Sequence, residues 1–178
     1  MSDISSKRFY YRILTLADVG EKYVRWMNDK DVNKYLESRF SNHTTDAVHS
    51  YIKNSLNDSS VHLFGIFNKT TDCHIGNIKL DINHTHKKAE IGLLIGEKQW
   101  WGKGVATEAI KAITKYGFTE CDIEKIEAGC YQSNKGSLGA FQKVGYKVEG
   151  RIRASWILEG KREDGFRLGI LKGEFNEQ

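Results

Sequence analysis

Apolar residues recur along the chain with two different periods, and each period predicts its own kind of element. Runs in which apolar residues alternate with polar ones, or dominate a short stretch, are typical of strands. Polar turns rich in Asn, Asp, Thr and Gly separate these runs, and the sequence contains no Pro. The pattern predicts strands over residues 8–16, 61–67, 74–81, 88–95, 123–131, 146–158 and 167–171.

Apolar residues spaced three or four positions apart predict amphipathic helices between these strands. Such helices are expected to begin near Thr15–Asp18, at Thr44, after Gly104 and at Asn134. Thr, Asp and Asn are residues whose side chains cap the first turn of a helix. Gly145 follows the last helical stretch and is a typical C-terminal stop, because glycine readily adopts the left-handed conformation.

The order of the predicted elements is strand, two helices, three strands, helix, strand, helix and two strands. A helical crossover within residues 89–131 is expected to join two parallel strands, whereas polar turns join antiparallel ones. We therefore predict a single domain over residues 1–178 with an α/β (α+β type) fold. Its mixed seven-stranded central sheet would be flanked by about four helices.

Charge and composition narrow the class of protein. The formal net charge of +4 is spread along the 178 residues, which suits an anionic ligand but not a nucleic-acid surface. No apolar run approaches a membrane span, and the first residues lack a signal-peptide core. Cys73, Cys121 and Cys130 form no CxxC pair and are expected to be reduced thiols. We expect a cytoplasmic monomer or homodimer that binds neither nucleic acid nor membrane.

A glycine-containing run follows strand 88–95 and leads directly into a helix. It reads Gln99-Trp100-Trp101-Gly102-Lys103-Gly104. The two glycines let the backbone approach a ligand, and the first turn of the helix presents free N–H groups at the positive end of the helix dipole. Taken alone, the run indicates either a pyrophosphate site or an ordinary turn.

Several further sequence stretches accompany this glycine-containing run and make its interpretation more specific. The run fits the pattern Gln/Arg-x-x-Gly-x-Gly/Ala. It is accompanied by Glu90-Ile91-Gly92-Leu93, Ala106-Thr107-Glu108-Ala109, Asn134-x-x-Ser137 and Lys143-x-Gly145-Tyr146-x-x-Glu149-Gly150-x-x-Arg153. From about Arg8 to Lys172 the chain therefore resembles the GNAT superfamily of N-acetyltransferases, in particular its RimJ/RimL-like branch. The resemblance implies an acyltransferase that moves an acetyl group from acetyl-CoA to a primary amine.

The resemblance also implies where the acetyl-CoA lies, in a cleft where two central strands splay apart. The pyrophosphate would rest on backbone N–H groups of residues 102–105, and the pantetheine would pair like an extra strand along residues 93–95. Lys143 either meets a phosphate or is a solvated helix lysine. The expected cofactor contacts are Leu93, Leu94, Ile95, Gln99, Trp100, Gly102, Lys103, Gly104, Val105, Ala106, Thr107, Asn134, Ser137, Phe141 and Lys143.

The catalytic residues depart from the pattern of the superfamily. Many members carry a glutamate base and a tyrosine acid at the positions of Gly129 and Phe141, so neither role carries over. Ser137 matches the serine that is suggested to protonate the thiolate in the RimL-type branch, whereas the glutamate proposed as base there corresponds to Ser155. Glu90 is our first choice for the base, because burial in an apolar strand would raise its pKa. It is equally a candidate structural carboxylate.

Other routes for the amine proton stay open. Glu127 shares a strand face with Gly129 and is an alternative base. Histidines 74, 84 and 86 are of a residue type that can act as a base, but they fall at strand starts and turns, and we expect no metal site there. Positioning alone, with water removing the proton, is the remaining possibility.

The acceptor amine is expected opposite the cofactor, between residues 26–40 and the hairpin of residues 151–164. Candidate contacts are Tyr35, Arg39, Trp156 and Asp164, although for Asp164 we favour a role in fixing the hairpin turn. The acceptor is either a small-molecule amine or a peptide N-terminus. Two alternatives are an amino-sugar-nucleotide N-acetyltransferase of surface-glycan synthesis and a non-catalytic CoA-binding module.

Overall fold

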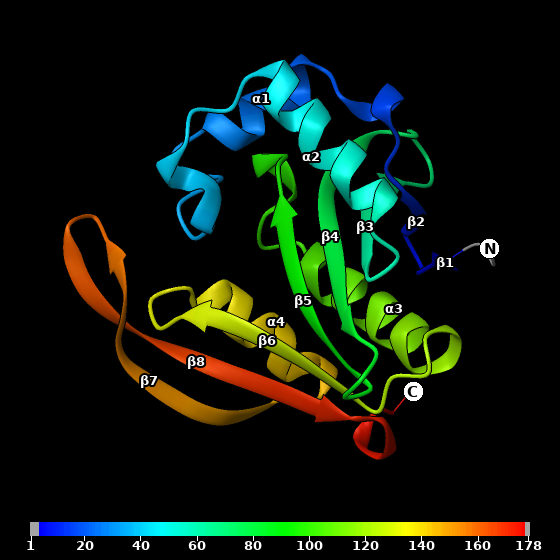
Figure 1. Ribbon diagram of the computed structural model, residues 1–178, viewed down its shortest axis with the longest axis vertical. Coiled ribbons are helices and arrows are strands. Elements are labelled where there is room, and N and C mark those ends of the chain that lie inside the picture. Colours follow the sequence, from blue (N-terminus) through cyan, green and yellow to red (C-terminus); the bar gives the residue numbers. More distant parts are fainter. Residues whose placement is uncertain (1–3, 177–178) are drawn as a thin grey trace.

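A mixed eight-stranded sheet forms the centre of the structure, a computed structural model that describes residues 4–176 (Figure 1). Its strand order is β1-β2-β3-β4-β5-β6-β8-β7, and among these neighbours only β5 and β6 run parallel. The strands are β1 (Ile4–Ser5), β2 (Phe9–Ile13), β3 (Val61–Asn68), β4 (His74–Asn83), β5 (Lys88–Ile95), β6 (Lys125–Tyr131), β7 (Lys147–Leu158) and β8 (Lys161–Leu171).

Four α-helices surround this sheet within the described residues, so the predicted fold class is confirmed. The helices are α1 (Glu21–Asn28), α2 (Thr45–Asn57), α3 (Val105–Glu120) and α4 (Lys135–Val144). The described residues also contain four short 3-10 turns. Two lie between a strand and a helix, η1 (Leu16–Asp18) and η3 (Lys98–Trp100), while η2 (Glu37–Phe40) lies between α1 and α2 and η4 (Lys172–Glu174) follows β8.

Three of the differences from the sequence prediction have a clear local reason. The eighth strand is β1, which is too short for alternation to reveal it. The carboxylate of Asp18 accepts hydrogen bonds from the backbone and hydroxyl of Thr15 around a 3-10 turn, and α1 starts only after an extended Gly20. Strand β8 begins at Lys161 rather than near residue 167. The turn before it needs only Glu159 and Gly160, which both have positive φ.

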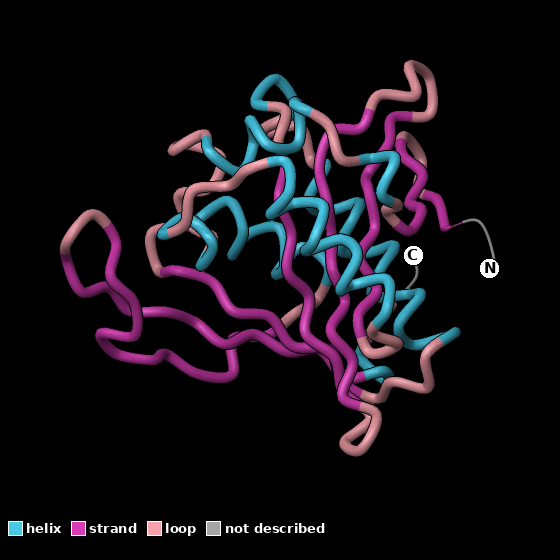
Figure 2. The backbone as a smooth tube through the Cα atoms, turned by 45° about the horizontal axis from the view of Figure 1, so that its top comes forward, coloured by secondary structure: helices cyan, strands magenta, loops and turns pink. Residues whose placement is uncertain are grey.

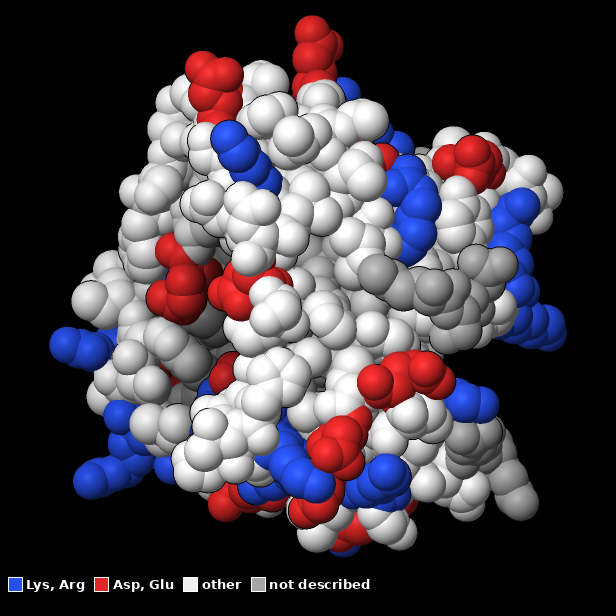
Figure 3. Space-filling model, turned by 45° about the vertical axis from the view of Figure 1, so that its right-hand side comes forward, with Lys and Arg blue, Asp and Glu red and all other residues white. Residues whose placement is uncertain are grey.

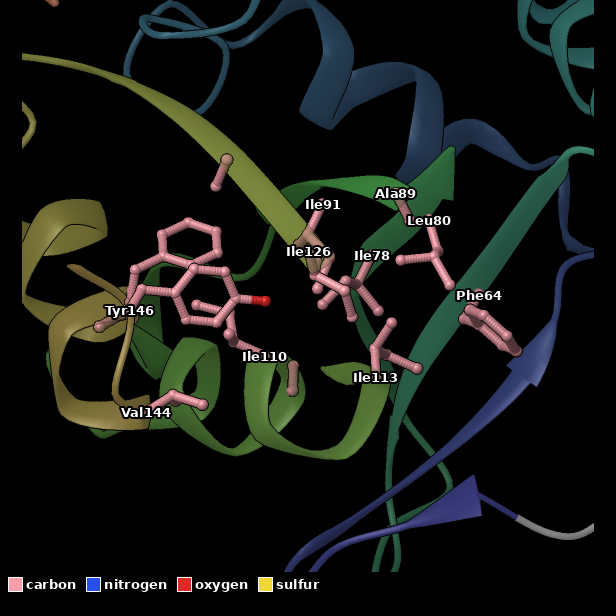
Figure 4. Packing of buried hydrophobic residues seen from close by; sticks show 14 of the residues in the cluster. Phe64, Ile78, Leu80, Ala89, Ile91, Ile110, Ile113, Ile126, Val144 and Tyr146 are labelled. Carbon is pink, nitrogen blue, oxygen red and sulfur yellow. The ribbon is translucent and has the colours of Figure 1, made fainter. Parts of the chain in front are cut away.

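Two buried clusters lie on opposite faces of the sheet. Helices α3 and α4 close the larger one, where Ile110 and Ile113 of α3 meet Ile78 and Ile126 of the strands (Figure 4). Helices α1 and α2 cover the other face, in a smaller cluster that includes Tyr23, Trp26, Val48, Ile52, Leu63 and Leu94. One face of β4 and β5 therefore packs in the main core, and the other face is turned toward α1 and α2.

Strands β5 and β6 pair over a short stretch and then separate. Their ladder joins Lys88, Ala89 and Glu90 to Lys125, Ile126 and Glu127, and it ends there. Beyond this point β5 still pairs with β4 as far as Ile95, and β6 still pairs with β8 as far as Tyr131. Figures 1 and 2 show the two strands diverging from a common base. The opening lies between strands that are rigidly held on their outer sides.

Helix α1 is fixed against the end of β5 by its tryptophan. The indole N–H of Trp26 donates to the carboxylate of Glu97 at 3.1 Å, and the ring lies over Gly96. A Cβ atom at position 96 would overlap that ring, so the close packing requires glycine. This contact sets the height of α1 above the diverging strands.

We expect Gly96→Ala to lower the free energy of unfolding by roughly 1–3 kcal/mol, because the added methyl group overpacks the Trp26 contact. The matched control is Gly139→Ala in the middle of α4, where nothing lies within 4 Å of the new Cβ. That control should be neutral or stabilising by about 0.5–1 kcal/mol. Chemical denaturation of both variants measures the difference, and equal stabilities would contradict the packing argument.

Candidate active site

The loop between β5 and α3 has the geometry that an anion site needs. Gly102 and Gly104 adopt left-handed conformations, with φ of 69° and 76°. Gly104 is also the N-cap residue of α3 and supplies no side-chain cap. The N–H groups of the first turn therefore have no capping side chain and lie at the positive end of the helix dipole. Gly102, Lys103 and Gly104 are all exposed, so a ligand can reach this backbone.

Arg8, which directly precedes β2 and is far from this loop in sequence, holds the loop in place. Its guanidinium donates to the Lys103 carbonyl at 2.7 Å and to the Glu108 carboxylate at 2.6 Å. The Ser6 hydroxyl also donates to Glu108. Burial alone would raise the pKa of Glu108, but the hydrogen bonds from Arg8 and Ser6 outweigh it and hold the pKa below its usual value. The loop is thus tied to the start of the chain, a contact that the motif itself does not reveal.

The backbone edge of β5 and the start of α4 form the rest of this side of the opening. Leu93 and Ile95 are half-buried on the edge, whereas Leu94 is buried against α1 and α2. Asn134 is the N-cap of α4, and its amide oxygen accepts from the Ser137 N–H at 3.1 Å. The amide N–H₂ of Asn134 and the half-buried Ser137 are therefore the polar groups at this helix start.

The remaining predicted cofactor residues differ in accessibility. Gln99 and Lys143 are exposed, and Trp100 packs edge-on against Phe9 with ring centroids 5.6 Å apart. Phe141 does not fit its expected contact. It is 1% exposed and packs against Tyr146 inside the main core. Its ring supports α4 from within. Along the first turn of α3, the Val105 side chain is buried, and Ala106 and Thr107 are half-buried.

Two carboxylates stand at the base of the opening, as neighbours across the last pair of the β5–β6 ladder. The expected burial of Glu90 is wrong, because its side chain is 46% exposed and pairs with Arg167 at 3.0 Å. Burial would raise the pKa of Glu127, but Lys88 at 2.9 Å and Lys125 at 3.2 Å outweigh it and lower that pKa. Glu127 is therefore held as an anion by two lysines, and Glu90 is the more open of the two.

Gly129 leaves space that other side chains occupy. A Cβ at this position would lie 3.3 Å from the Arg167 guanidinium, 3.8 Å from the Glu90 carboxylate and 3.9 Å from the Trp156 ring. The Glu90 carboxylate therefore lies next to the space that a side chain at position 129 would occupy. The sequence indicated Glu90 as a candidate but gave no sign of its partner Arg167, which comes from β8.

Aromatic side chains from three segments meet at the wide end of the opening. Trp156 stacks on Tyr131 with centroids 4.5 Å apart, and Tyr35 lies against the same tyrosine at 5.5 Å. The Tyr131 hydroxyl donates to Glu37 at 2.7 Å, and burial with this hydrogen bond raises the pKa of Tyr131 to about 12. Tyr35 and Trp156 come from the two segments expected to flank the acceptor, and both rings pack against Tyr131.

Two other predicted acceptor contacts are engaged in holding this wall in place. The Arg39 guanidinium donates to the Leu36 carbonyl and, at 2.6 Å, to the Ile157 carbonyl of the β7–β8 hairpin. Asp164 accepts from the Ala154 N–H and from Arg151, and these bonds lower its pKa. Asp164 therefore fixes a bulge in β7 at Ala154 rather than the hairpin turn itself, which lies at Glu159 and Gly160.

A pocket of about 540 Å³ lies next to β5 on the α1–α2 side of the sheet. Its walls come from α1, residues 36–43, α2 and the faces of β3, β4 and β5, including Gly92, Leu93 and Leu94. Position 92 has no atom within 4 Å of where a Cβ would stand. The pocket therefore reaches β5 at an open position, close to the edge that faces the diverging β6.

Other kinds of site find little support in residues 4–176. No group of three or more His, Cys, Asp or Glu side chains there is arranged to hold a metal ion. No helix in the same range has the length and apolar character needed to span a bilayer. Acidic and basic side chains are interspersed on the face shown in Figure 3.

Comparison with known proteins identifies relatives of the whole chain. The model of the acetyltransferase (GNAT) domain matches residues 8–147. The uncharacterized N-acetyltransferase p20 of Bacillus licheniformis is 28% identical over 178 residues, which cover 98% of this chain and 99% of that protein.

Two solved structures share the fold. Spermidine N-acetyltransferase from Vibrio cholerae, in complex with CoA and spermine, has a TM-score of 0.86 and 22% identity, covering 95% of this chain and 98% of that one. RimL, a ribosomal L7/L12 α-N-protein acetyltransferase in complex with coenzyme A, has a TM-score of 0.85 and 15% identity, covering 96% and 98%. At these identities the likeness shows the fold alone.

We expect Arg8→Ala to speed amide hydrogen exchange in residues 102–107, because the loop loses its bond to the Lys103 carbonyl. Arg12→Ala is the matched control, since it breaks a comparable pair with Asp18 that does not touch the loop. The unchanged protein should show the same loosening as pH falls through the depressed pKa of Glu108, and the pair should be intact above the usual glutamate pKa. Exchange rates insensitive to Arg8 would contradict the bracing.

Proposed function

This chain belongs to the GNAT family of N-acetyltransferases, and from that premise we propose that it takes an acetyl group from acetyl-CoA and transfers it to a primary amine. The amine is carried by a small molecule or by a peptide N-terminus. The observation that carries the proposal is the divergence of β5 from β6 directly before the glycine loop at the start of α3. That arrangement offers a backbone edge and an anion site in continuous sequence.

The pyrophosphate of acetyl-CoA fits the glycine loop. Positive φ at Gly102 and Gly104 turns the backbone so that a Cβ would be strained there, and the first N–H groups of α3 carry no side-chain cap. Lys103 and Thr107 add an ammonium and a hydroxyl. Proposed contacts of the CoA head are Gln99, Trp100, Gly102, Lys103, Gly104, Val105, Ala106, Thr107 and Lys143.

The pantetheine arm fits the free edge of β5. Amide groups along this arm would replace the hydrogen bonds that β6 no longer makes beyond Glu90. Leu93 and Ile95 flank that edge, and Leu94 contributes backbone. Across the opening, the amide N–H₂ of Asn134 is the group that would meet the arm, because its oxygen already caps α4.

Acetyl-CoA supplies a thioester, from which the acetyl carbon forms a C–N bond with the amine while its C–S bond breaks. The chain must take one proton from the attacking nitrogen and give one to the departing sulfur. Glu90 is the proposed proton acceptor, acting directly or through one water. Ser137 is the proposed donor, from the first turn of α4, and it regains its proton from solvent.

Glu90 is favoured as the base by its surroundings rather than by burial. It lies at the base of the opening, is half-exposed, and reaches the space beside Gly129. Arg167 orients the carboxylate through two hydrogen bonds. Glu127 is the alternative base, but two lysines already hold it. A non-catalytic CoA-binding module would need neither carboxylate to act.

Acetyl-CoA binding is expected to depend on the left-handed conformation at Gly104. Gly104→Val should weaken binding at least about tenfold, because a β-branched residue disfavours positive φ and moves the N–H groups. Gly160→Val is the control, since Gly160 has a φ of 78° in the hairpin turn, outside the proposed cofactor site. Calorimetry measures binding, and thiol release with a panel of amines measures transfer. Binding without transfer to any amine would favour the non-catalytic module.

Glu90→Gln is expected to lower kcat by about 10²–10⁴-fold while leaving acetyl-CoA affinity nearly unchanged, because it removes the base and keeps the shape. Ser137→Ala should lower kcat in the same direction. Glu127→Gln serves as the comparison, and there we expect the main effect on stability. Steady-state thiol release measures all three variants. Full activity in Glu90→Gln together with a large loss in Glu127→Gln would reverse the assignment.

A further inference from the structure

The pocket beside β5 lies on the same sheet face as Glu90. The antiparallel register of β4 and β5 pairs Asn77 with Leu94, Lys79 with Gly92 and Asp81 with Glu90. Residues two apart on a strand share a face, so these three pairs form a row along one surface. Asn77 and Lys79 line the pocket, and Glu90 stands at the lower end of the row.

Asn77 forms part of the pocket lining and carries an unsatisfied donor. The residue is 4% exposed, and its Nδ2 has no hydrogen-bond partner among the described residues. Such an orphaned buried group is rare in folded proteins, where buried polar atoms are nearly always paired. A ligand in the pocket would supply the missing acceptor.

The orientation of the Asn77 amide follows from its neighbour His74. The His74 Nε2 lies 3.0 Å from the Gly76 carbonyl oxygen, which can only accept, so Nε2 carries a hydrogen. The Asn77 atom 2.7 Å from the same Nε2 must then be the amide oxygen. Burial lowers the pKa of His74, which keeps the ring neutral. Nδ2 is thereby turned away from His74.

Tyr23 is the polar neighbour on the other side of this amide. Burial raises the pKa of Tyr23, and a side-chain hydrogen bond from the Asn77 amide opposes that rise, although the contact lies outside normal hydrogen-bond geometry. An amide carries two N–H bonds and Tyr23 can take at most one of them, so Asn77 keeps a free N–H within the described part of the chain. Around it, the pocket is mostly apolar, with walls from Met27, Leu36, Val48, Leu63, Leu93 and Leu94.

The charges of this face do not suit a polycation. Glu37 is the acidic residue that lines the pocket, and it lies 3.7 Å from Arg39. Asp81 pairs with Lys79 at 2.7 Å, and Glu90 pairs with Arg167. Each of these three carboxylates already has a cation of the chain beside it. A polyamine would have to compete for every one of these partners.

We propose that Asn77 selects the acceptor, donating through Nδ2 to an oxygen of a primary amine whose body is apolar. The inference rests on the proposed acetyl transfer and names its substrate class, an amine with a carbonyl oxygen within reach of its apolar part. The carbonyl oxygen lies at Asn77 and the reacting nitrogen lies over Gly92, from where Glu90 is reached through one water, while the apolar part lies among the leucines of the pocket. The amine loses one proton as its C–N bond forms, as in the transfer described above.

Two probe amines test the contribution of the carbonyl oxygen of the substrate. Leucinamide and 3-methylbutylamine carry nearly the same apolar body, and the first has an added carboxamide. We expect Asn77→Leu to lower the ratio of kcat/KM for leucinamide over that for 3-methylbutylamine at least about tenfold, because only leucinamide loses a hydrogen bond. The different basicities of the amines cancel when the ratio in the variant is compared with that in the unchanged protein.

Asn42→Leu is the matched control, because Asn42 lines the same pocket but is exposed. It should leave the ratio unchanged. Acetyl-CoA binding and the unfolding midpoint are measured for each variant. A second readout needs no variant. In the unchanged protein, the side-chain N–H₂ resonances of Asn77 should shift with leucinamide and stay in place with 3-methylbutylamine.

The outcomes separate this inference from the function on which it rests. Failure of acetyl-CoA to bind would remove the proposed function itself. Turnover of both amines with a ratio unchanged in Asn77→Leu would overturn the role of Asn77 alone. Spermidine used better than leucinamide, and equally well by Asn77→Leu, would show a polycation acceptor and overturn the substrate class. If turnover is too slow to measure, the Asn77 resonances decide, and no shift with leucinamide overturns the inference.

Discussion

Backbone hydrogen bonding between β5 and β6 is the constraint on which the rest of this structure depends. The two strands pair for three residues and then diverge, although each remains bonded to its other neighbour. A strand edge inside a protein carries donors and acceptors that must find partners. The divergence therefore leaves a backbone edge with which the amide groups of a ligand can pair, and the glycine loop follows at the end of that edge.

Long-range braces keep the opening in shape. Arg8 ties the glycine loop to the start of the chain, and Arg39 ties the segment after α1 to the β7–β8 hairpin. Lys34 and Glu159 add a second link between the same two segments. These contacts surround the opening rather than cross its base. The site can therefore be rigid at its rim while the β5 edge and the pocket beside it stay accessible.

The carboxylates on the acceptor face illustrate why burial alone is a poor guide to chemistry. Glu90 was expected to be buried because its strand is apolar, but it points to the face that the opening exposes, toward Arg167. The alternation along β5 contained this information in principle, since Ile91 and Ala89 take the core side. Alternation does not reveal that Arg167 of β8 is the partner of Glu90, because Arg167 lies 77 positions further along the chain.

The sequence by itself determined the element order, the parallel crossover and the glycine loop, because these depend on local periodicity and on residues with unusual backbone freedom. It also indicated Tyr35 and Trp156 as candidates on the two segments that flank the acceptor. Only the tertiary structure decided that Phe141 is a core residue, that Asp164 holds a bulge, and that Asn77 is left with a free donor. The reason is physical. Burial, ion pairing and hydrogen-bond satisfaction are properties of side chains brought together from distant strands, and a linear pattern carries no record of those neighbours.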